Sequence, residues 1–249
     1  MNKPSFRCRS RWLGYAVAFF ASTSCVTPAV ASVVMNGTRF VYRAGEKEIV
    51  VKVSNVGKLP ALTQAWLDDG DANAKPEAID VPFNVTPPIA RVEAGKSQTL
   101  RVAYTGGELP ADRESQFWLN VLEVPPKAET TDDDSGQMQL AFRYRLKLFY
   151  RPKGMAGSPD AAAEKLAWAI PGGGGISVSN DSAFHVTVND LKLTVDGKDV
   201  EAEPFALEPH GVYTIPTKAV VDKGTRVEIE FQTINDYGGF EKHSTSLGH

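Results

Sequence analysis

The sequence of 249 residues is long enough for one large domain or for two of ordinary size. With 42% hydrophobic and 23% charged residues it can bury a core, which excludes wholesale disorder. The formal net charge of -3 shows no basic excess and argues against nucleic acid as the main partner. Both cysteines, Cys8 and Cys25, lie near the N-terminus.

Residues 1–31 have the pattern of a secretory signal peptide. Three arginines precede an uncharged apolar run at 13–22, and Ala29-Val30-Ala31 forms a small-x-small cleavage pattern. A membrane anchor is disfavoured because the apolar run is well short of the roughly 20 residues needed to span a bilayer. Lipid attachment at Cys25 is disfavoured because the three preceding residues lack the usual leucine. We therefore predict cleavage after Ala31 and export of the remaining chain.

Cleavage after Ala31 changes the chemistry available to the protein. The leader carries four basic and no acidic residues, so residues 32–249 have a formal charge of -7 and no cysteine. Without cysteine the exported chain cannot form disulfides and must rely on its core. The same lack excludes thiol enzymes, iron–sulfur proteins and cysteine-ligated zinc sites.

Short β-type runs separated by turn residues follow the leader. We predict strands at 38–42, 48–54, 62–67, 89–92, 97–103, 117–124 and 138–150, and then at 175–178, 184–195, 212–216 and 226–234. This spacing, without a long helical period, predicts antiparallel β-sandwiches of the immunoglobulin size class. The stretch 151–159 contains two prolines and two glycines and breaks the pattern. We therefore predict an N-terminal domain at 32–152, a linker at 153–159 and a C-terminal domain at 160–249.

No catalytic, metal or cofactor site stands out in the sequence. The four histidines are scattered without helical i,i+4 partners, so each is interpreted as a surface residue: His185, His210, His243 and His249. There is no nucleophile elbow and no phosphate-binding loop, and the glycine run 172–175 is interpreted as a flexible turn. The pattern therefore favours a protein that is not an enzyme.

The predicted strand at 138–150 is the most unusual segment of the chain. Fully extended, it would be about 44 Å long, more than twice the usual strand. Period two places its apolar residues on one face, namely Met138, Leu140, Phe142, Tyr144, Leu146 and Leu148. Its first half follows an acidic loop at 127–137, interpreted as a solvated loop tip. An edge of this kind invites another chain to pair with it.

A series of short motifs along the chain, including the end of this strand, resembles those of a known protein family. In chain order they occupy 38–42, 64–70, 86–88, 91–95, 109–115, 117–120, 125–127, 146–152 and 234–239. In this order they resemble the PapD-like periplasmic chaperones of chaperone–usher pilus assembly. The resemblance implies two immunoglobulin-like domains set at an angle around a cleft, and a periplasmic, non-enzymatic function. Such a chaperone lends its long strand to a pilin subunit that lacks one, and delivers the subunit to an outer-membrane usher.

The resemblance also implies roles for individual residues. Arg39 and Lys147 match the cations that grip the C-terminal carboxylate of the subunit. The residues inserted into the subunit groove would be Met138, Leu140 and Phe142, and the interdomain ion-pair group would be Glu114, Arg151 and Asp236. Groove filling would contribute about 1.5–3 kcal/mol for each large apolar side chain. The cations would set the register, because a slip of one residue turns every apolar side chain away from the groove.

Two other functions stay open at this point. A secreted immunoglobulin-like binding or adhesion module would explain the sandwiches but not the matched cations. A secreted hydrolase on a β-sandwich would need a convergent polar site that the sequence does not show. No later apolar run approaches membrane-spanning length, so we expect no membrane insertion. The exposed apolar strand leaves self-association of the free protein as an open alternative.

Overall fold

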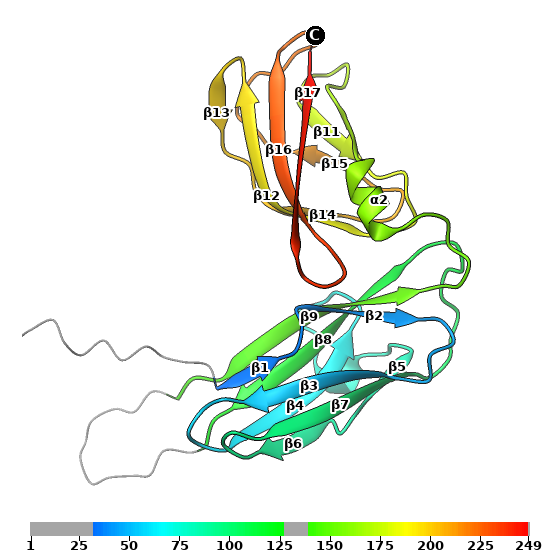
Figure 1. Cartoon of the computed structure of the whole chain (residues 1–249), viewed down its shortest axis with the longest axis vertical. Helices are drawn as coiled ribbons and strands as arrows, with labels where there is room; N and C mark the ends of the chain where they lie inside the picture. The colour runs from blue at the N-terminus through cyan, green and yellow to red at the C-terminus, as the bar shows by residue number, and fades with distance from the viewer. Residues whose placement is uncertain (1–31, 127–138, 249) are drawn as a thin grey trace, which may run out of the picture. The chain divides into compact units, whose positions relative to one another are not determined.

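The computed structural model describes residues 32–126 and 139–248, which belong to a compact unit, Ser32–His249. The predicted leader with both cysteines, the acidic loop 127–137 and Met138 lie outside the described residues. The described chain is almost entirely β, and its strands form two sandwiches of immunoglobulin type (Figure 1). The predicted fold class is therefore confirmed.

Two sheets form the first sandwich. One has the order β1-β3-β7-β5, from strands Val33–Met35, Ile49–Asn55, Ser97–Tyr104 and Phe83–Thr86. The other has the order β2-β9-β8-β4-β6, from Arg39–Arg43, Phe142–Arg151, Ser115–Val124, Ala61–Asp68 and Ile89–Val92. A single 3-10 turn, η1 (Pro76–Ala78), follows β4. Every pairing in this sandwich is antiparallel except that of β2 with β9, which is parallel.

The second sandwich follows a short helix. Helix α2 (Pro159–Glu164) starts after Ser158, whose side chain accepts a hydrogen bond from the Ala161 N–H. One sheet has the order β10-β11-β15, from Ala167–Ala169, Ile176–Ser179 and Val212–Ile215. The other has the order β13-β12-β16-β17, from Lys198–Val200, Val186–Val195, Val227–Ile234 and Phe240–Leu247, and β14 (Phe205–Leu207) also pairs with β12.

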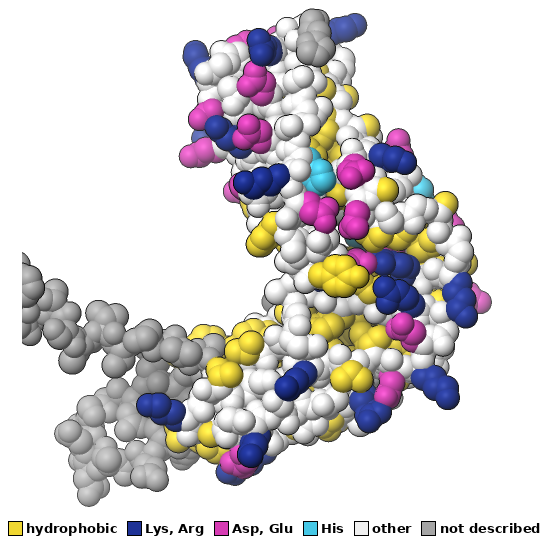
Figure 2. Space-filling model, in the orientation of Figure 1, with side chains coloured by type: hydrophobic (Ala, Val, Ile, Leu, Met, Phe, Trp, Pro, Cys, Tyr) yellow, Lys and Arg dark blue, Asp and Glu magenta, His cyan; other side chains and the backbone are white. Residues whose placement is uncertain are grey.

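Charged side chains of both signs are interspersed over the visible face of both sandwiches (Figure 2). That face does not show the single-sign basic field on which nucleic-acid binding depends. Of the helices in the described part of the chain, none is long and apolar enough to cross a membrane.

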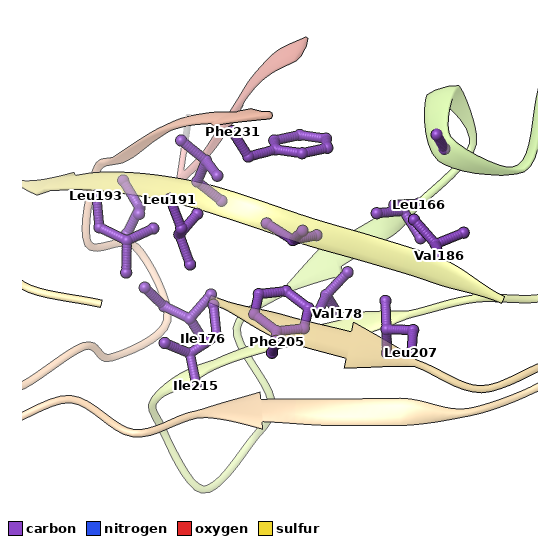
Figure 3. Packing of buried hydrophobic residues seen from close by; sticks show 14 of the residues in the cluster. Leu166, Ile176, Val178, Val186, Leu191, Leu193, Phe205, Leu207, Ile215 and Phe231 are labelled. Carbon is purple, nitrogen blue, oxygen red and sulfur yellow. The ribbon is translucent and has the colours of Figure 1, made fainter. Parts of the chain in front are cut away.

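Each sandwich encloses its own hydrophobic core. The first core contains the fully buried Leu100, Leu119 and Leu148 and a cluster of aromatic rings in which Tyr42 and Phe83 meet edge to face at 5.4 Å. The second core lies between the two sheets of the second sandwich and includes Ile176, Leu193, Phe205, Leu207 and Phe231 (Figure 3). Alternating burial along the strands produces both cores, as in β16, where every other residue is buried.

The long strand differs from its prediction at its N-terminal end. The structure begins β9 at Phe142, and residues 139–141 are not part of a strand. The last pair of the β8–β9 ladder is Glu123↔Phe142. Beyond it, β8 ends at Val124 and continues into Pro125 and Pro126, which have no N–H group to donate to a ladder. The predicted strand of about 44 Å is therefore wrong over residues 139–141, because the neighbouring strand stops.

Candidate functional site

Strand β9 has two edges that differ along its length. One edge pairs with β8 from Phe142 to Tyr150. The other edge pairs with β2, but only from Lys147 to Arg151. Among residues 32–126 and 139–248, nothing pairs with the second edge over 142–146. Half of the strand therefore presents backbone N–H and C=O groups to a further strand.

Apolar side chains mark the start of this unpaired segment. Leu140 is 50% exposed and Phe142 is 37% exposed, which is unusual for large apolar residues beside a well-packed core. Further along β9, Leu146 is partly buried and Leu148 is fully buried in the first core. The apolar face of the strand thus passes from the core to solvent. Met138, the third predicted groove-filling residue, lies outside the described residues.

Arg39 and Lys147 meet at the point where the unpaired segment ends. They are direct partners in the parallel β2–β9 ladder. The Arg39 guanidinium donates to the Ile234 carbonyl at 2.7 Å, and the Lys147 ammonium donates to the Thr187 hydroxyl at 2.9 Å. In the described residues neither cation forms an ion pair, and the buried Nε of Arg39 has no hydrogen-bond partner. Two adjacent cations that form no ion pair within the described residues make a site that favours an anion.

The surroundings of the two cations disfavour their charge. Burial, together with the neighbouring Arg39 guanidinium, lowers the pKa of Lys147 to about 8. Burial also lowers the pKa of Arg39, although the carboxylates of Asp236 and Glu114 act in the opposite direction. A bound carboxylate would offset the cost of burying these two positive charges, because it supplies a negative charge beside them.

Arg151 connects two carboxylates from distant parts of the chain. Its Nη1 and Nη2 donate to Asp236 at 2.7 and 3.0 Å, and its Nε donates to Glu114 at 2.7 Å. Glu114 is 4% exposed, and its other oxygen accepts the His185 N–H at 2.9 Å. Although burial works against the charge of Arg151, hydrogen bonds to Asp236 and the charges of both carboxylates raise its pKa. The structure therefore brings together the three residues of the expected ion-pair group.

His185 is not the surface residue that its scattered sequence position indicated. Its side chain is only 9% exposed, its ring lies 5.4 Å from that of Phe149, and its Nδ1 is 3.3 Å from Glu114. His243 is also in contact with its sandwich, stacked on Phe231 at 4.9 Å. Sequence spacing missed both contacts because they connect residues that the fold, not the local chain, brings together. No group of metal-ligating side chains occurs in the part of the chain that the structure describes.

Sequence reasoning also missed a polar network on the second face of β9. Asp68, fully buried at the end of β4, forms ion pairs with Arg145 and, at 3.6 Å, with Arg143. Its carboxylate also accepts from the Asn120 side chain at 2.7 Å and from the Gly70 N–H at 2.8 Å. Burial opposes ionisation, but these hydrogen bonds, with Arg145 the strongest, hold the pKa of Asp68 below its ordinary value.

The guanidinium groups of the two arginines in this network lie over tryptophan rings. The guanidinium of Arg143 lies 4.9 Å from the ring centre of Trp66, and that of Arg145 lies 4.3 Å from that of Trp118. Arg143 also donates to the Ala72 carbonyl at 2.6 Å. The contacts fasten the half-paired part of β9 to strands β4 and β8. The basic residues at alternate positions of the strand, Arg143 and Arg145, were a sequence signal for such a network. Asp68 was not, because in the sequence it resembles an ordinary turn residue.

Comparison with known proteins identifies the family. Residues 32–156 match the model described as "Pili and flagellar-assembly chaperone, PapD N-terminal domain", and residues 161–245 match "Pili assembly chaperone PapD, C-terminal domain". The chain belongs to the PapD family of pilus-assembly chaperones. The resemblance stated from the motifs is thereby confirmed, and the chain can be compared with other chaperones of the family.

Similar proteins cover nearly the whole chaperone. The chaperone protein FimB/FhaD of Bordetella pertussis is 43% identical over 247 residues, which is 96% of this chain and 99% of that protein. The crystal structure of the YadV chaperone has a TM-score of 0.73 at 35% identity and covers 87% of this chain and 100% of its own. A complex of the Salmonella enterica SafA pilin with the SafB chaperone has a TM-score of 0.70 at 29% identity, covering 90% of this chain and 99% of that chain.

Proposed function

We propose that this chaperone binds pilin subunits that lack a strand, completes their fold with its own strand β9, and passes them to an outer-membrane usher. The proposal places it in the periplasm after removal of residues 1–31. The SafB chaperone, which shares its fold, is described in complex with a pilin. No catalytic step is needed for this function, because strand exchange between chains forms and breaks only non-covalent contacts.

The observation that carries the proposal is the unpaired edge of β9 at 142–146. Strand addition to such an edge supplies main-chain hydrogen bonds, and alternate side chains supply specificity. Leu140 and Phe142 are exposed beside this edge and are positioned to enter an apolar groove of the partner. We propose that Met138, two residues before Leu140, continues the alternation of apolar residues and also enters the groove.

Arg39 and Lys147 are proposed to bind the C-terminal carboxylate of the subunit. They lie at the end of the unpaired segment, where β2 takes over the edge of β9. Charge-assisted hydrogen bonds contribute about 1.5–3 kcal/mol each, whereas the apolar side chains together contribute more. Affinity would therefore come mainly from the groove, and the cations would fix the register of the paired strands.

The Arg151 group is proposed to join the two domains. Arg151 lies near the end of the predicted domain 32–152, and its partner Asp236 belongs to the predicted domain 160–249. Glu114 is proposed to join the domains in the same way. Its carboxylate forms an ion pair with Arg151 and accepts a hydrogen bond from the backbone N–H of His185. A joint of this kind would hold Arg39 and Lys147 next to Ile234 and Thr187, their hydrogen-bond partners in the second sandwich.

Co-purification with a subunit tests the proposal. The chaperone is co-expressed with a pilin encoded near its own gene, and the wild type is compared with Leu140→Glu. Because a charged side chain cannot enter an apolar groove, we expect subunit recovery to collapse while the thermal unfolding temperature stays unchanged. Leu59→Glu is the matched control, since Leu59 is also exposed, at 63%, but is remote in sequence from β9.

The anchor is tested in the same assay. Arg39→Ala and Lys147→Ala should each lower subunit recovery at least tenfold, because either change removes a charge-assisted hydrogen bond to the carboxylate. Wild-type recovery with both variants would contradict the anchor. Wild-type recovery with Leu140→Glu would contradict strand donation.

A further inference from the structure

Glu123 is a buried carboxylate that the proposed function does not use. It lies on β8 with 3% of its surface exposed. Its Oε1 accepts the Ser32 N–H at 3.2 Å and also the Ser32 hydroxyl, and its Oε2 accepts the Val33 N–H at 3.2 Å. The Tyr144 hydroxyl donates to Oε2 at 3.4 Å. Every partner of this carboxylate is thus a neutral donor, and two of the donors belong to Ser32.

Glu123 has no positive partner within the described chain. Neither a lysine, an arginine nor a histidine of residues 32–126 and 139–248 forms an ion pair with it. A buried carboxylate is costly unless it is both hydrogen-bonded and paired with a charge. Glu114 and Asp68, the other buried acids of this sandwich, both have an arginine partner. Among these buried acids, Glu123 therefore lacks the positively charged partner that would offset the cost of its burial.

Ser32 is the residue at which the exported chain is expected to begin. The small-x-small pattern predicts cleavage after Ala31. The compact unit of the structure starts at Ser32, and the match to the first family domain also starts at residue 32. The predicted cleavage site and the start of the fold therefore coincide at one peptide bond, next to a buried carboxylate.

The surroundings of Ser32 hold it in place. Its carbonyl accepts the Val56 N–H at 2.7 Å. The neighbouring Gly57 leaves the necessary space, because a Cβ at that position would lie 2.5 Å from the Cβ of Ser32. The nitrogen of Ser32 is thus fixed toward Glu123 by contacts on the carbonyl side of the residue. A larger residue at position 57 would displace it.

We propose that Glu123 is a binding site for the α-ammonium group that forms at Ser32 when the leader is removed. A signal peptidase would hydrolyse the Ala31–Ser32 bond with one water molecule, leaving a carboxylate on Ala31 and an amine on Ser32. An α-amino group has an ordinary pKa of about 7.7–8.0, so it takes up a proton at neutral pH. The neutral N–H donor becomes a cation with three donors, and the buried carboxylate acquires its counterion.

Processing would in this way complete the first sandwich. Val33 begins β1, which pairs with β3, and Tyr144 lies on the half-paired part of β9. The ion pair would therefore fasten strand β1 to β8 beside the strand that is proposed to bind subunits. An uncleaved chain would keep the hydrogen bonds but lack the charge. The inference does not depend on subunit binding.

A double-mutant cycle on the exported protein tests the inference. The full chain is expressed with export, and intact mass establishes the first residue. The wild type is compared with an insertion of one serine between Ala31 and Ser32, which moves the ammonium one residue away from Glu123. We expect the insertion to lower the thermal unfolding temperature by about 5 °C or more. In a Glu123→Gln background the same insertion should cause almost no further change, because the carboxylate is already gone.

A second measurement covers the case in which Glu123→Gln does not fold. In the folded wild type, the α-amino group should react with an amine reagent at least tenfold more slowly than in the insertion variant. Glu203→Gln, at an exposed position of the second sandwich, is the matched control and should change neither readout. The inference is overturned if the exported chain starts at a residue other than Ser32. It is equally overturned if the insertion leaves the unfolding temperature and the amine reactivity unchanged, or lowers that temperature equally in both backgrounds.

Discussion

Lys147 lies directly opposite Arg39 in the parallel β2–β9 ladder, so the fold places two positive charges side by side without an acid between them. Both cations are held by neutral oxygen atoms, the Thr187 hydroxyl and the Ile234 carbonyl. Such an arrangement stores unfavourable electrostatic energy in the free protein, which an anionic ligand can release.

Subunit binding should weaken at alkaline pH. The pKa of Lys147 is about 8 in the free protein, and a bound carboxylate would raise it. Affinity should therefore be constant below about pH 7 and fall by up to tenfold per pH unit above about pH 8. Titration calorimetry with a peptide that carries the subunit's C-terminal strand measures this. Lys147→Arg, which stays charged, should bind with little pH dependence. A wild-type affinity that is flat from pH 7 to 9.5 would contradict the prediction.

Removing the Lys147 charge should stabilise the free chaperone. The folded pKa of about 8 lies below the ordinary 10.5, so the unfolded chain binds more protons between these values. The free energy of unfolding should therefore rise as pH increases from about 8 to 10.5. Below pH 8, Lys147 is charged in both states and destabilises the folded protein to its full extent. Lys147→Met should raise the free energy of unfolding by on the order of 1–3 kcal/mol at pH 7, with a smaller gain at pH 10. Chemical denaturation at both pH values measures the effect, and an equal gain at both would refute this explanation.

Loss of Arg151 should be strongly destabilising. Arg151→Ala leaves the buried Glu114 without its cation and also removes the ion pair with Asp236. We expect a loss of about 3–5 kcal/mol in the free energy of unfolding, measured by calorimetry on the full chain. Arg226→Ala is the matched control, because Arg226 pairs with Glu228 on an exposed surface and should cost about 0–1 kcal/mol. Similar losses in the two variants would show that burial of the Arg151 group does not matter.

Asp68 should determine how firmly the half-paired part of β9 is held. Asp68→Asn removes the charge that Arg143 and Arg145 share and should lower stability by about 2–3 kcal/mol at pH 7. Because the folded pKa of Asp68 is below the ordinary 3.8, its contribution is complete above that value and is lost as pH falls through the folded pKa. The difference between wild type and variant should therefore shrink at pH 2.

Hydrogen exchange at residues 142–146 gives an independent measure of the Asp68 network. Amides of this segment should exchange faster in Asp68→Asn, since its arginines lose the buried partner that fastens them. Asp181→Asn, at an exposed position of the second sandwich, is the control and should change neither stability nor exchange. Unchanged exchange in the Asp68 variant would show that the backbone ladder with β8 alone holds the segment.

Much of the fold could be predicted because the strands alternate strongly. Residues 89–92 were predicted with the same bounds as β6, and most other predicted strands differ by one or two residues. The missed strands are short or polar, such as β10 and β17, so they lack the apolar alternation that reveals a strand. The start of β9 was predicted too early because its apolar pattern continues past the point where β8 ends.

The candidate site was less accessible to sequence reasoning. Arg39, Lys147, Glu114, Arg151 and Asp236 were named only through the resemblance to a family, because they are spread over nearly 200 residues. Their proposed functions stay predictions. The burial of His185 and of Asp68 could not be read from local pattern, since tertiary packing alone brings them to their partners. The same holds for Glu123, whose donors on Ser32 and Val33 are remote in sequence.

The parallel pairing of β2 with β9 also limits what kind of chain can occupy the free edge. A guest strand can pair with residues 142–146 in the same direction as β9. The C-terminal end of such a strand would then reach Arg39, the first residue of β2. It could continue no further, because β2 already fills the edge from Lys147 onward. A polypeptide that ends at this point fits, whereas one that continues must turn away or lose its pairing. The chaperone would thus select its guests by where their chain ends, because only a terminus at this position keeps the whole free edge paired.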